Sequence, residues 1–190
     1  RRAATCSAPP PALLRNTAYS TILYHEFGHN FMRTPGYDVI VETNEVFADL
    51  MSAYFTGSPL LGKDLFGVGT VRRDISEVWI YPVEDPVDTE HDPGRPFTGS
   101  MWEVLQGLVS VDPVNGAETA SQLYFGWMRG YIEAGGDPVL GPGIVVDVLQ
   151  ADEEVFEPGG DYRPPHGELI AEAFGHHNLL VPFRRGDANS

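Results

Sequence analysis

The feature that most constrains this chain is an HExxH pattern, His25-Glu26-Phe27-Gly28-His29. It lies in a segment, roughly residues 16–33, that we predict to form one helix. Residues four apart lie on the same face of a helix, so His25 and His29 can direct two imidazoles at one metal ion. Glu26 stands beside them, within reach of a water held by that ion. Because the pattern is short and also occurs by chance, the residues that follow must support it.

A second set of polar residues begins at Asn44, fifteen residues after His29. Asn44 opens a second predicted helix, which runs to about residue 56. Glu45 is placed to supply a third ligand, because zinc accepts carboxylate oxygen and a His2Glu set leaves a fourth position for water. Asp49 lies one turn beyond Glu45, where its carboxylate can accept the second ring N–H of a ligand histidine. These residues together predict a zinc centre of the catalytic type.

Charge and composition exclude several kinds of partner. The chain has 190 residues, enough for one domain, and its net charge of −15 argues against nucleic acid or an anionic membrane as partner. No apolar run approaches the ~18–20 residues that cross a bilayer. The single cysteine, Cys6, rules out an internal disulfide.

The domain organisation follows from composition along the chain. We predict a Pro-containing leader over residues 1–15, one domain over 16–182 and a tail over 183–190. The first helix has apolar residues on more than one face, which predicts that it is buried inside the domain. Residues 57–96 carry many turn signals, and a stretch of this length is often functional, for example as a cleft wall.

The fold class we predict is mainly α (α+β overall), with little extended structure. Residues 38–41 read as extended, and Ile75–Val83 reads as a strand, with Val78–Tyr81 the best window. Further helices are predicted over residues 99–110, with Thr98 as N-cap, and over 117–134, 144–151 and 166–177.

Two further residues are candidates for the site. His91 lies on a loop just before a predicted helix, where it could donate a hydrogen bond to the oxyanion of a tetrahedral intermediate. The alternative for His91 is a surface histidine in a turn. Tyr37, in the link between the two metal-binding helices, could donate its phenol to the same oxyanion, or it could serve packing alone. We interpret His166 and the pair 176–177 as solvated or capping histidines.

Two acidic sets could hold calcium, which takes about 6–8 oxygen ligands. Neither has the spacing of an EF-hand loop, so we favour a solvated acidic face and keep Ca²⁺ as the alternative. The sets are Glu84, Asp85, Asp88, Glu90 and Asp92, and Asp152, Glu153 and Glu154.

Three patches of the chain resemble the gluzincin metallopeptidases, the group that includes thermolysin and fungalysin. Residues 25–29 with 44–49 look like the paired zinc helices of that group. His91 followed by residues 99–105 looks like its histidine loop and following helix, and residues 169–179 are similar to the way those catalytic domains close.

The resemblance implies a zincin-like helical domain and a secreted zinc endopeptidase that acts on peptide or protein substrates. His25, His29 and Glu45 would bind one catalytic zinc ion. Glu26 would be the general base for a zinc-activated water, with Asp49 as the partner of a ligand histidine. His91 would stabilise the oxyanion.

The same group has an upstream β-rich lobe whose edge strand aligns the substrate, whereas only 24 residues precede His25 here. We therefore expect that this lobe or a propeptide lies on a separate or deleted segment, or that the substrate wall is different. Two other functions stay open. A zinc-bearing structural or binding module would have no need of Glu26. An aminopeptidase would need a carboxylate to hold a free amino terminus, and no motif supplies one recognisably.

Overall fold

The computed structural model describes residues 20–33, 41–133, 140–156 and 164–179. The predicted mainly-α fold class is confirmed, because helices dominate these residues and their strands form one small two-stranded sheet. The predicted leader, 1–15, and tail, 183–190, lie outside the described residues. In the described ranges, every helix is too short or too polar to cross a membrane.

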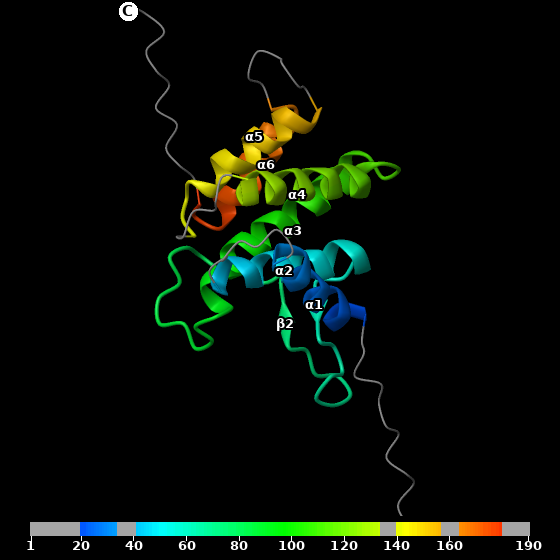
Figure 1. The fold of residues 1–190 in the computed structure, drawn as a ribbon, viewed down its shortest axis with the longest axis vertical. Helices are drawn as coiled ribbons and strands as arrows, with labels where there is room; N and C mark the ends of the chain where they lie inside the picture. Colours follow the sequence, from blue (N-terminus) through cyan, green and yellow to red (C-terminus); the bar gives the residue numbers. More distant parts are fainter. Residues whose placement is uncertain (1–19, 34–40, 134–139, 157–163, 180–190) are drawn as a thin grey trace, which may run out of the picture.

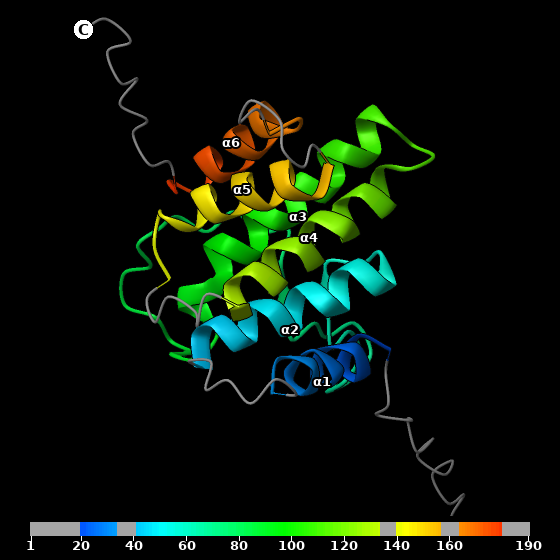
Figure 2. The same ribbon diagram turned by 45° about the horizontal axis from the view of Figure 1, so that its top comes forward.

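The helices form a stack, with α1 and α2 at one end and α5 and α6 at the other (Figures 1 and 2). α2 contacts α3, α3 contacts both α4 and α6, and α4 contacts α5. In chain order the elements are α1 (Ser20–Arg33), α2 (Val41–Thr56), β1 (Leu60–Leu61), β2 (Arg73–Asp74), the 3-10 helix η1 (Asp92–Gly94), α3 (Arg95–Val111), α4 (Gly116–Glu133), α5 (Ile144–Phe156) and α6 (Gly167–His176).

The core is one cluster of apolar side chains, mainly from α2, α3, α4, α5 and α6. α2 is apolar around much of its circumference, and this pattern places it between other helices rather than at the surface. Two tyrosine hydroxyls cross the core: Tyr124 donates to Phe47 O at 2.8 Å, and Tyr54 donates to Met101 O at 2.8 Å. The buried apolar side chains of α2 include Val46, Phe47, Leu50 and Met51.

α1 packs closely on α2 because it carries a glycine at the crossing. A Cβ added to Gly28 would lie 2.7 Å from Ala48 Cα, so only glycine lets the two backbones approach this far. The prediction that α1 is buried inside the domain is wrong. Its outer face is exposed at Leu23, Phe27 and Phe31.

The strands β1 and β2 pair in antiparallel fashion, and we call this pair the hairpin. It lies beside α1 and α2 (Figure 1). Leu60 pairs with Asp74, and Leu61 pairs with Arg73. The Gly62 N–H donates to Thr21 Oγ1 at 3.3 Å, which joins the hairpin to α1. This placement brings Arg73 close to the metal-binding helices.

The strand predicted over Ile75–Val83 is wrong, because its backbone groups bind the end of α6 instead of another strand. The Tyr81 N–H donates to His177 O at 2.9 Å, and Asn178 donates its side-chain N–H to Tyr81 O at 2.7 Å. A short window of apolar residues cannot distinguish these two partners.

Several helix boundaries also differ from the prediction. α2 already includes Val41, which we read as extended, and α5 continues five residues beyond residue 151 to Phe156. α3 begins at Arg95 with a proline in its first turn. Thr98 therefore lies inside α3, where its hydroxyl donates to Gly94 O at 3.1 Å, and it is not the predicted N-cap.

Candidate metal centre

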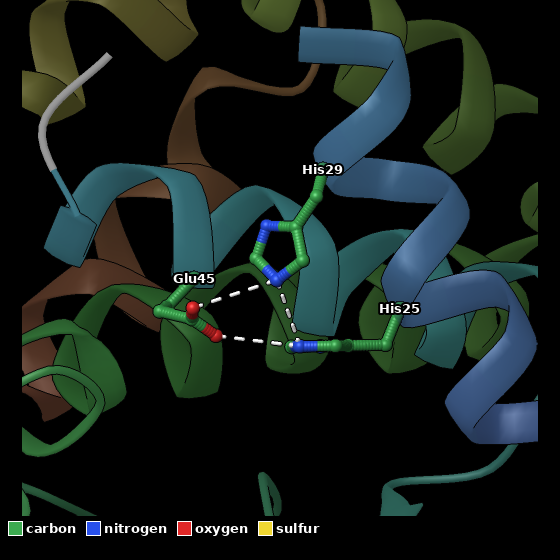
Figure 3. Close-up of side chains that lie close together, drawn as sticks. All are labelled: His25, His29 and Glu45. Atoms are coloured by element: carbon green, nitrogen blue, oxygen red, sulfur yellow. Dashed lines mark hydrogen bonds and ion pairs between the residues drawn. The ribbon is translucent and has the colours of Figure 1, made fainter. Parts of the chain in front are cut away.

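Three side chains from α1 and α2 point toward one another (Figure 3). The two imidazole Nε2 atoms of His25 and His29 lie 3.0 Å apart. Glu45 places Oε2 3.3 Å from His25 Nε2 and Oε1 3.4 Å from His29 Nε2. The three donor atoms lie within 4.8 Å of one another, so this group could hold a metal ion.

The outer nitrogen of each imidazole already has a partner. Asn44 Oδ1 accepts a hydrogen bond from His29 Nδ1 at 2.9 Å, and Asp49 Oδ1 lies 2.7 Å from His25 Nδ1. A proton on each Nδ1 leaves each Nε2 as a lone-pair donor. Two such lone pairs 3.0 Å apart, beside a carboxylate, repel one another unless a proton or a cation lies among them.

The spacing of the donors fits a small divalent cation. Tetrahedral ligands at ~2.0–2.1 Å from one zinc ion are about 3.3 Å apart. Here the two Nε2 atoms are 3.0 Å apart, and they lie 3.3 and 3.4 Å from the two different carboxylate oxygens of Glu45. Two imidazoles and a carboxylate suit zinc and also several other divalent metals, so the donor set does not fix the identity of the ion.

Arg73 completes the surroundings of His25. Its Nε donates to Asp49 Oδ2 at 2.8 Å and its Nη2 donates to Asp49 Oδ1 at 2.6 Å, a bidentate pair. Sequence analysis missed this residue, because an arginine in a turn-rich stretch has no spacing that relates it to α2. It also missed Asn44, although that residue directly precedes Glu45.

His91 lies where the sequence predicted it, next to the metal-binding group. Its Nε2 is 2.9 Å from Glu45 Oε2, and its Nδ1 donates to Asp88 Oδ1 at 2.8 Å. The contact with Glu45 raises the pKa of His91 above its ordinary value, burial opposes this effect, and Asp88 adds to it. Asp88, which we assigned to an acidic face, therefore orients His91.

The carboxylates and the cationic side chains of the centre shift one another's pKa values. Burial alone would raise the pKa of Glu45, but His25 and His91 outweigh it and hold this pKa below its usual range. His25 and Arg73 do the same for the buried carboxyl of Asp49. Burial lowers the pKa of His25, yet the carboxylates of Asp49 and Glu45 outweigh it and raise the pKa from 6.5 to about 9.

The remaining predicted site residues have different outcomes. Glu26 is exposed on α1, directly after His25, whereas Tyr37 lies outside the described residues. His166 precedes α6 and binds Asp152 through Nδ1 at 2.7 Å. His177 is the C-cap residue of α6, which agrees with the capping alternative. It is not solvated, because its ring is buried and its Nδ1 donates to Trp79 O at 2.7 Å.

The interpretation of the acidic sets as solvated is wrong for two members, Asp92 and Asp152, which are buried. Asp92 Oδ2 accepts hydrogen bonds from two backbone N–H groups at 3.0 and 2.9 Å. Within the described ranges, neither acidic set gathers three donor atoms as His25, His29 and Glu45 do.

Comparisons of this chain with protein-family models, with curated proteins and with solved structures found no match. The case for a function therefore depends on the geometry of the metal centre and on the chemistry of its side chains.

Proposed function

We propose that this chain is a zinc-dependent endopeptidase. The observation that supports this most strongly is the convergence of His25, His29 and Glu45 at spacings that suit a tetrahedral zinc ion. Both imidazoles have an outer partner that directs Nε2 inward, and such partners are typical of working metal centres.

Each remaining part of the chemistry has a candidate residue. Bound zinc would polarise the scissile carbonyl and lower the pKa of a coordinated water toward ~7. Glu26 is exposed to solvent directly beside the first ligand, so it can take a proton from water and pass it to the leaving amine. His91 carries an N–H group at the edge of the centre, where it would stabilise the developing oxyanion.

The test is to incubate zinc-loaded protein with a mixed peptide pool and to identify fragments by mass spectrometry. The matched control is Glu26→Gln, which removes the base and keeps the shape of the side chain. We expect the variant to bind an equimolar amount of zinc and to lose at least about 100-fold in cleavage rate.

The outcomes separate the parts of the proposal. Fragments made equally fast by Glu26→Gln would reject Glu26 as the base. No cleavage by either protein, with zinc still bound, would replace the peptidase with a zinc-bearing binding or structural module. No zinc binding at all would reject the metal centre itself.

A further inference from the structure

The metal centre has an outer contact that comes from neither of its two helices. Arg73 belongs to β2, and its guanidinium makes two hydrogen bonds to Asp49, at 2.8 and 2.6 Å. The side chains of Arg73 and Asp49 are only 10% and 6% exposed, so water hardly competes for this pair. A shielded bidentate pair of this kind has a well-defined orientation.

The orientation of Asp49 decides the direction of His25. A single oxygen, Asp49 Oδ1, lies 2.6 Å from Arg73 Nη2 and 2.7 Å from His25 Nδ1. The second bond, from Arg73 Nε to Asp49 Oδ2, prevents the carboxylate from rotating away. The imidazole of His25 is thereby held with Nε2 toward Glu45, 3.3 Å from its Oε2.

We infer that Arg73 is a positioning residue of the metal centre, which sets the metal affinity by fixing Asp49 and, through it, His25. The inference rests on the proposed metal site, and it makes the hairpin part of that site. Backbone hydrogen bonds hold Arg73 in place from both sides: Arg72 N–H donates to Leu61 O at 2.9 Å, and Ile75 N–H donates to Pro59 O at 3.0 Å.

A matched arginine in the same region makes no contact with the centre in the described structure. Arg95 forms ion pairs with Glu77 at 2.7 Å and with Asp92 at 3.7 Å, and it donates to Asp74 O at 3.3 Å. Its Cζ lies 4.0 Å from the centroid of the Trp79 ring. Its side chain is 17% exposed, close to the value for Arg73. Arg95→Met therefore serves as a control for the loss of a guanidinium that is shielded from water.

The test measures zinc affinity by competition with a chromophoric chelator. Arg73→Met should weaken zinc binding by roughly 10–100-fold, as the loss of other outer partners of metal ligands does. Arg73→Lys keeps the charge without the planar fork, so it should restore only part of the affinity. Arg95→Met should bind zinc as the unmodified protein does. If Arg73→Met fails to fold, the zinc affinity of Arg73→Lys is compared with that of the unmodified protein instead.

A double-mutant cycle with Asp49→Asn distinguishes positioning from general stability. If Arg73 acts through Asp49, adding Arg73→Met to Asp49→Asn should change zinc affinity by less than about 3-fold. The absorption spectrum of the cobalt-substituted protein should shift in Arg73→Met and stay unchanged in Arg95→Met.

Three results would overturn the inference while leaving the proposed function intact. These are unchanged zinc affinity in both Arg73 variants, full additivity in the cycle, or a rise in peptide KM with no change in zinc affinity. The last result would assign the guanidinium to substrate. Absence of zinc binding by the unmodified protein would instead reject the proposed metal site.

Discussion

The two ligand histidines differ in the charge of their outer partners. His29 faces the neutral amide of Asn44, whereas His25 faces the carboxylate of Asp49. A carboxylate partner makes an imidazole more basic, and the pKa of His25 is raised to about 9 against the opposing effect of burial. In the metal-free protein, His25 is therefore a cation at neutral pH, and a metal ion must displace its proton.

This competition between the proton and the metal ion predicts that the stability of the metal-free fold and the affinity for zinc depend on pH in opposite directions. The folded state raises the pKa of His25 from 6.5 to about 9, so His25 stabilises the metal-free fold fully below pH 6.5. That stabilisation, up to about 3 kcal/mol, is lost as the pH rises to 9. Zinc affinity should rise about tenfold per pH unit over the same window.

Denaturant unfolding of the metal-free protein between pH 6 and 10 measures the first effect, and chelator competition measures the second. His25→Gln is the control, because it has no proton to lose and should flatten the stability profile over that window. A metal-free stability that increases from pH 6.5 to 9 would contradict the assignment of this proton to His25.

At the residue scale, sequence spacing could predict His25, His29, Glu45 and Asp49, because helical periodicity places each of them on a known face. It could not predict Arg73 or Asp88. Their contacts depend on the path of the irregular segment between α2 and α3, which no local pattern encodes. His91 could be predicted from its place before a helix and from the resemblance of that stretch to a histidine loop.

Among the elements, the α1–α2 pair decides whether the centre forms. The ligands come from both helices, and Gly28 allows the close crossing that brings them together. A Cβ at this position would lie 2.7 Å from Ala48 Cα and 3.2 Å from Met51 Cβ. The first of these neighbours is backbone and cannot move aside alone.

Gly28→Ala should therefore push α1 away from α2, destabilise the fold by about 1–3 kcal/mol, and weaken zinc binding. Gly130→Ala is the control, since a Cβ there meets nothing within 4 Å and alanine favours helix by about 0.5–1 kcal/mol. Thermal unfolding and zinc titration of both variants give the answer. Equal behaviour of the two variants would exclude a special role for the crossing.

At the same scale, apolar periodicity predicted the long helices well and the extended segments poorly. The long helices have apolar residues at a 3.6-residue period, and each helix contains many such positions, so the pattern is easy to recognise. The window around Val78–Tyr81 has only four residues, and its backbone is bound by the end of α6. The length of α5 was underestimated because its last turn is acidic and reads as a loop.

For the whole molecule, α1 lies at one end of the stack of helices (Figure 2). It contacts α2 and the hairpin, and it exposes Leu23, Phe27 and Phe31. Polar contacts already join α1 to α2: Ser52 Oγ donates to Thr21 O at 2.7 Å, and at the metal centre His25 Nδ1 lies 2.7 Å from Asp49 Oδ1. A metal ion held by both helices would strengthen the link at the centre.

Zinc removal should therefore lower the stability of the whole fold and should loosen α1 first. A ligand that binds only the folded state adds about 2.7 kcal/mol when its free concentration is 100 times Kd, so Tm should rise steadily with free zinc. Hydrogen exchange in the chelated protein should increase most in α1 and least in α3, which is buried at the centre. His29→Ala is the control, because without this ligand neither zinc nor chelator should move Tm appreciably. A Tm that is independent of zinc in the unmodified protein, together with uniform exchange, would mean that the protein's own contacts hold α1 on α2 without a metal ion.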